Sequence, residues 1–528
     1  MADKLLWGRW VVVSADDVRE DSAVLLRGGR VAEIGPAPEM RARHAGVPEH
    51  GGADCAILPG LINAHHHCYG VELANQKVGD DFLEPWMFCG PSMVGLSPYV
   101  SSAHSAVRLL KTGVTAVVDM CSAGVTRDSG EARLLEKAQA YRDAGLRAAI
   151  APGERWQNRI VHGAGEEAGF LATLPQNLRD DLARSEAGRA RLSPDAYFDL
   201  MAALVPQGDG LRDFWFGPTG PQWTPDTVLA RVSQEAERLD TRIQTHALES
   251  YYEGLESQHI RGKHLMQHFA DQGFLTERLS LAHVVWAGPK DIEELARSGV
   301  QVSHNPSSNL RLRSGVAPIA DMCGNGVSVA LGMDGTTLGG AEDIFAEMRL
   351  ALALNTPPHR SAKALNARDV LALATQGGAR VLGRAHELGQ LQPGYCADAV
   401  VLDLSRPMSP WCAPDVDPIE LIVGRATAAD VRDVIVNGAL VVTQGTVTGL
   451  NETQLLQKLR AELDQSPPDD AALTLTRNLR RYLLDWYAHW EQAGTVPITR
   501  YGAPLPMHKT SLLAARTPAP KVKLGEVT

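Results

Sequence analysis

Cysteine is scarce in this chain, and its spacing excludes two common uses of the residue. The 528 residues include only seven cysteines, an odd number that never forms a Cys-x-x-Cys pair. A disulfide framework needs paired thiols, and a thiolate zinc site needs closely spaced ones. We therefore expect reduced thiols and a cytoplasmic location.

Long apolar runs and an excess of basic charge are absent as well. No stretch reaches the roughly 20 apolar residues that a membrane span requires, and the N-terminus has no sustained apolar segment. The formal net charge is −11, which gives no electrostatic footprint for DNA or RNA. These absences favour a globular protein whose partner is a small molecule, and exclude nucleic-acid and membrane partners.

Two β-rich stretches lie far apart in the chain. The first covers residues 5–57, with a hairpin turn at Gly28-Gly29, and the second includes 397–404 and 431–442. We expect them to form one small, discontinuous β-sandwich domain, into which the rest of the chain is inserted. Its predicted segments are residues 1–57 and 388–450.

The last part of the chain, residues 451–528, has a different pattern. Residues 451–464 and 473–491 predict two amphipathic helices, and residues 497–528 contain five prolines and are predicted to be extended. An arm of this kind can dock on a second subunit. We expect a homodimer or a higher homo-oligomer.

Between the β-rich stretches, short apolar segments alternate with helical patterns. Eight strands are predicted, at residues 57–67, 116–120, 148–151, 214–217, 243–246, 279–285, 301–304 and 329–334. This alternation over residues 58–387 predicts an α/β fold, a (β/α)₈ TIM-like barrel. In such barrels the chemistry takes place at the C-terminal ends of the strands.

Three consecutive histidines stand at the end of the first predicted strand. Successive strand side chains point to opposite faces, so His65 and His67 share a face and His66 points away. Two imidazoles on one face can chelate a metal ion. Taken alone, a histidine cluster in a polar loop explains the pattern equally well.

Further histidines and carboxylates follow the later strands. His246 ends the fifth strand and Glu249 follows it, His283 lies on the sixth strand, His304 ends the seventh and Asp334 ends the eighth. Imidazole and carboxylate ligands suit Zn²⁺ or Fe²⁺ better than Mg²⁺ or Ca²⁺. The recurrence at separate strand ends favours a metal site with room for water, although the residues after His304 are also typical of a turn and helix cap.

Six motifs, in this order, resemble the metal-dependent amidohydrolase superfamily: Leu58–His67, Thr245–Glu249, Leu281–Trp286, Ser303–Leu312, Leu331–Gly335 and Ala374–Gly383. They are most similar to its branch of guanine, adenosylhomocysteine and cytosine-type deaminases and triazine hydrolases. Gln390–Leu402 and Ile435–Gly438 match the small β domain of that branch. The resemblance covers roughly residues 5–450.

The resemblance implies a set of residue roles. One divalent metal ion, Zn²⁺ or alternatively Fe²⁺, would be bound by His65, His67, His246 and Asp334. Glu249 would act as the proton shuttle, and His283 would polarise the substrate or orient the water. Asp334 would also accept the proton of that water. His66 replaces a threonine that is common in the family and is expected to be a bystander.

A missing lysine favours one metal ion over two. Binuclear relatives bridge their ions through a carboxylated lysine at the fourth strand, yet no lysine lies between Lys137 and Lys263. Glu154, at the end of the third strand, is the minor alternative as a bridge.

The sequence thus predicts a mononuclear hydrolase that deaminates an amino-substituted purine, pyrimidine, pterin or triazine-type ring, a cyclic amidine, and releases ammonia. The alternatives are a same-fold hydrolase that displaces chloride or sulfur or cleaves an amide, and a non-catalytic binding protein on this scaffold. Zinc deaminases of the other architecture are excluded, because the Pro-Cys-x-x-Cys motif is missing. Candidate substrate contacts, each equally explained by packing or capping, are Trp86, Gln222, Trp223, His304 and Arg311.

Overall fold

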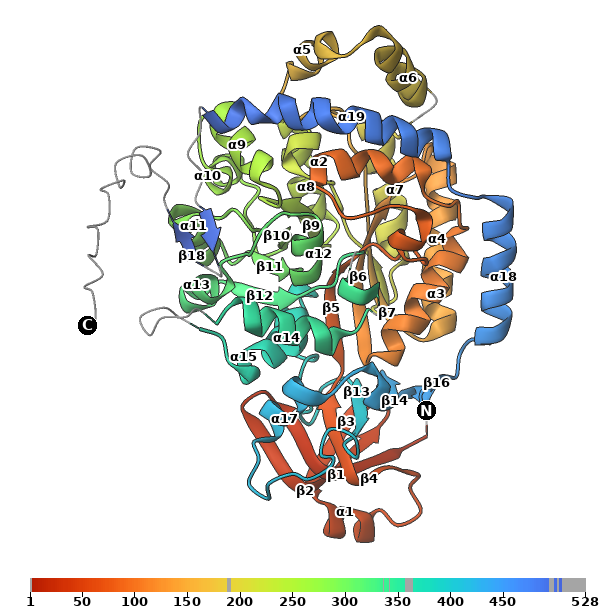
Figure 1. Cartoon of the computed structure of the whole chain (residues 1–528). Coiled ribbons are helices and arrows are strands. Elements are labelled where there is room, and N and C mark those ends of the chain that lie inside the picture. Colours follow the sequence, from red (N-terminus) through yellow and green to blue (C-terminus); the bar gives the residue numbers. More distant parts are fainter. Residues whose placement is uncertain are drawn as a thin grey trace, which may run out of the picture.

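A computed structural model of the chain describes residues 2–187, 191–335, 337–340, 342–356, 364–492, 498–500 and 503–505. A central barrel has a small β domain at one end and two C-terminal helices along its outside (Figure 1). None of the helices in this described part is long and apolar enough to cross a membrane.

Eight parallel strands form the barrel: β5 (Leu61–His66), β6 (Val114–Ser122), β7 (Arg147–Gly153), β8 (Arg212–Phe214), β9 (Ile243–Ala247), β10 (Leu279–His283), β11 (Gln301–His304) and β12 (Ser328–Leu331). Each pairs with its neighbour in sequence within two four-stranded sheets. Phe216 bridges to Ile243, and the Asp334 N–H donates to His65 O over 2.9 Å, so backbone hydrogen bonds connect the two sheets at both sides. The predicted TIM-like barrel is confirmed.

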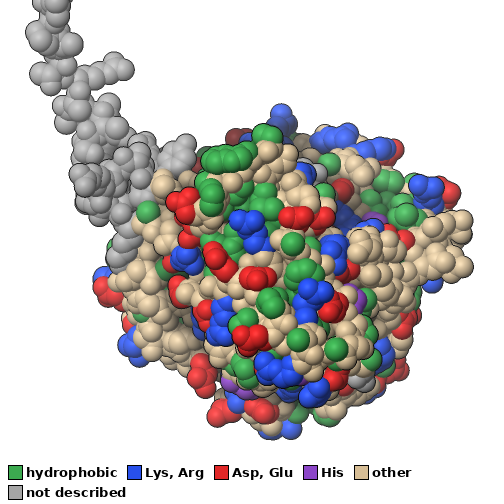
Figure 2. Space-filling model, turned by 90° about the horizontal axis from the view of Figure 1, so that it is seen from below, with side chains coloured by type: hydrophobic (Ala, Val, Ile, Leu, Met, Phe, Trp, Pro, Cys, Tyr) green, Lys and Arg blue, Asp and Glu red, His purple; other side chains and the backbone are tan. Residues whose placement is uncertain are grey.

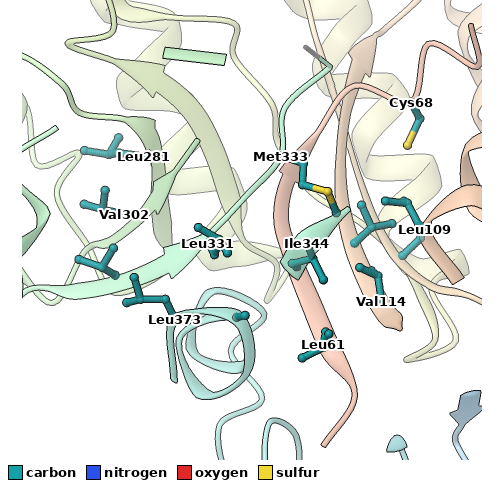
Figure 3. Packing of buried hydrophobic residues seen from close by; sticks show 14 of the residues in the cluster. Leu61, Cys68, Leu109, Val114, Leu281, Val302, Leu331, Met333, Ile344 and Leu373 are labelled. Atoms are coloured by element: carbon teal, nitrogen blue, oxygen red, sulfur yellow. The ribbon is translucent and has the colours of Figure 1, made fainter. Parts of the chain in front are cut away.

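Helices cover the outside of the barrel, as the alternating pattern predicts: α3 (Pro98–Lys111), α4 (Arg127–Ala144), α8 (Asp226–Arg238), α11 (Pro289–Ser298) and α14 (Ile344–Leu354). The barrel strands are covered on one face by these helices and on the other by the barrel interior, so both faces carry apolar side chains. In the core, Val114 of β6 lies beside Leu109 of α3, and Leu331 of β12 lies near Leu373 (Figure 3).

Further helices lie in the connections: α1 (Ala37–Arg43), α2 (Leu83–Trp86), α5 (Glu166–Thr173), α6 (Gln176–Ala187), α7 (Pro194–Leu204), α9 (Tyr251–His259), α10 (Leu265–Asp271), α12 (Pro306–Arg311), α13 (Ile319–Gly324), α15 (Ala367–Ala372), α16 (Gly378–Val381) and α17 (Pro418–Arg425). The 3-10 segment η2 (Met87–Ser92) follows α2 directly.

The small domain is built on one eight-stranded sheet: β1 (Lys4–Ser14), β2 (Asp17–Arg27), β3 (Arg30–Pro36), β4 (Glu49–Pro59), β13 (Ala399–Asp403), β14 (Val431–Val436), β15 (Ala439–Thr443) and β16 (Thr446–Val447). Both predicted half-sheets are present, and pairing of β4 with β13 joins them edge to edge. Gly28 and Gly29 have positive φ in the β2–β3 turn, as a two-residue hairpin requires. Figure 2 shows acidic and basic side chains interspersed over this end of the molecule.

The single strand predicted over residues 57–67 is in fact two strands, and Gly60 separates them. The Gly60 N–H donates to Asp398 O in the small domain, whereas the Leu61 N–H donates to Gly113 O in the barrel. A Cβ atom on Gly60 would lie 2.2 Å from Thr115 Oγ1, so only glycine allows this close approach. The prediction of one continuous strand was wrong because periodicity alone cannot show such a tertiary contact.

The two predicted C-terminal helices are present as α18 (Glu452–Gln465) and α19 (Asp470–Ala488). Of the predicted extended arm, the structure describes only β17 (Ile498–Arg500) and β18 (Ala503–Leu505), which pair as a hairpin; the remainder lies outside the described residues. Helix α19 runs across the top of the barrel (Figure 1).

Helix α19 holds the segment that contains α2 and η2. Arg480 donates to both carboxylate oxygens of Asp81 over 2.6 and 2.8 Å, and Thr476 Oγ1 donates to Phe88 O over 3.1 Å. Leu473 packs in one apolar cluster with Leu83 and Trp86. The C-terminal extension therefore fixes residues 77–97 against the open end of the barrel.

We expect Leu473→Ala to loosen this segment. Leu473 is 3% exposed, so its truncation should lower the free energy of unfolding by about 2–5 kcal/mol. Amide hydrogen exchange in residues 77–97 should become faster. Leu456→Ala on α18 is the matched control, because Leu456 is 38% exposed and should change stability by less than about 0.5 kcal/mol. Unchanged exchange in residues 77–97 of Leu473→Ala would contradict the role given to α19.

Candidate metal and catalytic site

The C-terminal ends of three barrel strands, β5, β9 and β12, bring three imidazoles and a carboxylate together. His67 Nε2 lies 3.2 Å from Asp334 Oδ1 and 3.3 Å from His246 Nε2, and His65 Nε2 lies 3.8 Å from Asp334 Oδ1. Two sets of side chains have ligand atoms within 4.8 Å of one another: His65, His67 and His246, and His65, His283 and Asp334. All four residues predicted to bind the metal thus meet in one place.

In His65, His67 and His246, the ring nitrogen that faces away from the cluster, Nδ1, is hydrogen-bonded to an oxygen atom. The Nδ1 atoms of His65, His67 and His246 lie 2.9, 3.0 and 2.6 Å from Gln244 Oε1, Met120 O and Thr219 O. Because these oxygens only accept, each Nδ1 carries the proton and each Nε2 presents a lone pair. Such outer partners orient metal-binding histidines in proteins.

The resulting set of lone pairs fits a cation. His67 Nε2 and His246 Nε2 cannot hydrogen-bond to each other when both are acceptors, yet they are only 3.3 Å apart. His65 Nε2 is buried and has no hydrogen-bond partner among the described residues. A buried acceptor without a donor is costly, and a divalent ion would satisfy all three nitrogens at once.

The pKa shifts of His65, His246 and Asp334 favour the protonation state in which each can bind a metal ion. Burial lowers the pKa of His65 well below its usual value, and burial together with His67 and His283 lowers the pKa of His246 to about 3. Burial alone would raise the pKa of Asp334, but His67, His65 and the Ser308 hydroxyl hold it below its usual range. His65 and His246 are therefore neutral and the Asp334 carboxylate is ionised at neutral pH, as metal binding requires.

His283 and Glu249 complete the polar cluster. His283 Nε2 lies 3.7 Å from Glu249 Oε2 and 3.7 Å from Asp334 Oδ2, while its Nδ1 lies 2.8 Å from Asn309 Oδ1. Burial, reinforced by the charge of Asp334, raises the pKa of Glu249 well above its usual value. A carboxyl group with a raised pKa can carry a proton near neutral pH.

Glu253 holds Glu249 in place. Its two carboxylate oxygens accept the backbone N–H groups of Leu248 and Glu249, each over 2.8 Å. Leu248 has φ +49°, so the chain turns sharply between the metal ligand His246 and Glu249. The sequence prediction missed Glu253, although its position four residues after Glu249 was a usable signal.

A cavity of about 450 Å³ opens beside the cluster, within the usual range of ligand pockets. It is lined by Glu249 and Asp334 and, among the predicted substrate contacts, by Trp86 and Trp223. Glu154 also lines it but belongs to neither set of potential metal ligands; its Oε1 accepts from the Arg155 N–H over 2.8 Å.

The residues that line the cavity do not include the other three predicted substrate contacts, Gln222, His304 and Arg311. Gln222 is buried, and its side-chain amide has no partner among the described residues. Arg311 donates to Asp80 Oδ1 over 2.8 Å and to Thr337 O over 2.7 Å, and His304 is buried at the end of β11. None of the three is among the residues that line the cavity, and their contact with substrate stays a prediction.

His66 points away from the ligands. Its Nε2 lies 3.4 Å from Glu342 Oε1, and its Nδ1 accepts the Cys68 N–H over 2.7 Å. The alternation of strand side chains thus separates His66 from His65 and His67, as the sequence predicted.

Comparisons with known proteins point to one family. The model of the family described as "Amidohydrolase family" matches residues 56–441. A second family model, an imidazolonepropionase-like composite domain of bacteria, matches residues 23–46. A 5′-deoxyadenosine deaminase from Methanosarcina barkeri is 30% identical over 466 residues, which cover 87% of this chain and 96% of the relative. A 5-methylthioadenosine/S-adenosylhomocysteine deaminase from Syntrophobacter fumaroxidans is 28% identical over 87% of this chain and 97% of its own.

Solved structures share the fold. An adenosine deaminase from Xanthomonas campestris with bound zinc superposes with a TM-score of 0.73 at 25% identity, over 88% of this chain and 98% of the other. An atrazine chlorohydrolase from Arthrobacter aurescens complexed with zinc gives a TM-score of 0.69 at 23% identity, over 87% and 100%. At 23% identity the likeness shows the fold alone.

We expect Gln244→Leu to weaken metal binding although Gln244 is not a ligand. The change removes the acceptor that orients His65 and should lower metal affinity about 10- to 100-fold. Gln222→Leu is the matched control, because that buried amide has no partner to lose among the described residues. Competitive chelator titration followed by metal analysis measures both variants, and equal affinities would contradict the orienting role of Gln244.

Proposed function

The chain belongs to the amidohydrolase family, and on this basis we propose that it deaminates an aminated nitrogen heterocycle, replacing the amino group with hydroxyl and releasing ammonia. One observation carries the proposal: Glu249, with its raised pKa, and Asp334, with its lowered pKa, both lie 3.7 Å from His283 beside the three imidazoles. Two carboxyl groups with opposite proton affinities are suited to move protons in opposite directions.

An adenine-type ring is the substrate that we favour. The similar proteins from Methanosarcina barkeri and Syntrophobacter fumaroxidans are named as deaminases of adenine nucleosides, and each aligns over nearly its whole length. Trp86 and Trp223 offer aromatic surfaces in the cavity, against which a planar ring can stack.

We propose Zn²⁺ as the metal ion, held by His65, His67, His246 and Asp334, with Fe²⁺ as the alternative. Neutral imidazoles and an ionised carboxylate suit these two ions. When bound, such an ion lowers the pKa of a water molecule to about 7 and so supplies the nucleophile at neutral pH.

The protein's own side chains then handle the protons. Asp334 is ionised before the reaction and accepts a proton from the attacking water. Glu249 donates its proton to the ring nitrogen next to the carbon under attack. His283 Nε2 lies 3.7 Å from a carboxylate oxygen of both Glu249 and Asp334, and from there it positions the water and the substrate relative to each other. The carbon gains oxygen, and Asp334 passes its proton to the amino group, which leaves as ammonia when the carbon–nitrogen bond breaks. The ring keeps the proton from Glu249, and the remaining proton of the added hydroxyl group passes to Glu249, so that both carboxyl groups return to their starting states.

Displacement of chloride or sulfur and cleavage of an amide use the same nucleophile, and the fold shared with the atrazine chlorohydrolase keeps them as alternatives. A screen for ammonia release over aminated purines, pyrimidines, pterins and triazines separates them from deamination. We expect release from an adenine nucleoside; silence across the whole panel would contradict the proposal.

We expect Glu249→Gln to keep its metal and lose turnover. Loss of a general acid typically costs about 10²- to 10⁴-fold in rate. Glu154→Gln is the matched control, since Glu154 lines the same cavity outside both ligand sets, and it should keep its metal and most of its activity. Steady-state ammonia release and metal analysis measure both. Full activity in Glu249→Gln would refute the shuttle, and metal loss in Glu154→Gln would support a bridging role for Glu154.

A further inference from the structure

Four buried residues join helix α19 to the turn that carries Glu249. The Tyr487 hydroxyl of α19 accepts the backbone N–H of His162 over 2.9 Å, and His162 Nε2 lies 3.2 Å from Glu84 Oε1 in α2. The same carboxyl oxygen accepts a hydrogen bond from the Ser250 hydroxyl. None of the four residues is more than 5% exposed. Three separate parts of the chain therefore converge on the residue that follows Glu249.

Ser250 is the point at which this network meets the catalytic turn. Its hydroxyl oxygen also accepts the Glu253 N–H over 3.1 Å and so caps the first turn of α9. Such a cap fixes the start of a helix, because it satisfies an N–H group that the helix itself leaves free. The Glu253 side chain in turn accepts the backbone N–H of Glu249. A shift of Glu84 therefore moves Ser250, the start of α9 and, through Glu253, the proton shuttle.

Aromatic packing links the same elements. The rings of Tyr487 and Tyr252 stack with centroids 4.7 Å apart, and Tyr252 belongs to α9. Phe82, which follows Asp81 in the chain, lies 6.4 Å from the Tyr252 ring and packs in the same apolar cluster. Helix α19 thus contacts both α9 and the segment over residues 77–97, and holds the two against each other.

We propose that Glu84 is a positioning residue of the active site, which holds Glu249 in line for proton transfer by anchoring Ser250 to helix α19. The inference rests on the proposed function and adds a catalytic role for the C-terminal extension, which lies beyond the residues that the amidohydrolase model matches. The described residues that line the cavity include Leu83 and Trp86 but not Glu84 itself. Its loss should therefore affect turnover more than substrate binding.

Steady-state ammonia release from 5′-deoxyadenosine by Glu84→Ala tests the positioning role. The change removes the acceptor shared by Ser250 and His162, so Glu249 should lose its alignment and kcat should fall about 10- to 100-fold. KM should change by less than about threefold, and the metal content should stay the same. Glu84→Gln keeps an oxygen that can accept both hydrogen bonds and should recover much of the turnover.

A double-mutant cycle shows whether Glu84 acts through Glu249. Glu84→Ala should lower the residual rate of Glu249→Gln by less than about twofold, because no shuttle remains to be misplaced. A loss of stability alone would lower the rate by the same factor in both backgrounds. Equal factors in the two backgrounds, or full turnover in Glu84→Ala, would overturn the inference.

Tyr487→Phe tests the outer end of the network. It removes the acceptor of the buried His162 N–H and should lower kcat by a smaller factor than Glu84→Ala, about 2- to 10-fold. Tyr482→Phe on the same helix is the matched control and should keep full turnover, because its hydroxyl is hydrogen-bonded to its exposed neighbour Arg481. Equal turnover in Tyr487→Phe and Tyr482→Phe would contradict the anchoring by α19.

Amide hydrogen exchange of the metal-loaded protein tests the network without turnover. In Glu84→Ala, the N–H groups of Leu248 and Glu249 should exchange faster, whereas those of β6 should be unchanged. If the unmodified enzyme releases no ammonia from 5′-deoxyadenosine, deamination of this substrate fails, and faster exchange still supports the anchoring of the turn. Unchanged exchange at Leu248 and Glu249 overturns the inference whether or not the enzyme is active.

Discussion

The rest of the site depends on three imidazole lone pairs that face one another. Nitrogen acceptors 3.3 Å apart repel unless a cation lies between them, and the fold holds them there because each ring donates its other N–H to a fixed oxygen. Two of these oxygens, Met120 O and Thr219 O, are backbone carbonyls, and the third belongs to the buried Gln244 side chain. The barrel backbone thus supplies the force that opposes the repulsion.

The remaining architecture positions this cluster and gives it a cavity. Gly60 lets the chain pass from the small sheet into β5, so that His65 and His67 reach the open end of the barrel. Across that end, α19 fixes the segment that contributes Trp86 to the cavity wall. Burial of the site strengthens the interactions between its groups and contributes to the opposite shifts in the pKa of Glu249 and Asp334.

Much of this could be predicted from the sequence, because strand alternation and strand ends are local properties. They were enough to place His65 and His67 on one face and to bring His246 and Asp334 to the same rim. The outer partners Gln244 and Glu253 were missed, since their roles exist only through contacts between elements. Gln222 and Arg311 were residue types suited to a pocket, but periodicity does not determine their contacts: Arg311, at the end of α12, donates to Asp80, and Gln222 is buried outside the cavity lining.

The most direct test of the account is X-ray absorption at the metal edge of the purified protein. The account predicts a first shell of nitrogen and oxygen at about 2.0–2.2 Å, with the outer-shell scattering of three imidazoles, and loss of one imidazole in His246→Ala. A sulfur ligand at about 2.3 Å, which Cys68 or Cys121 in the cavity wall could supply, or protein that holds no metal after purification without chelators, would contradict it.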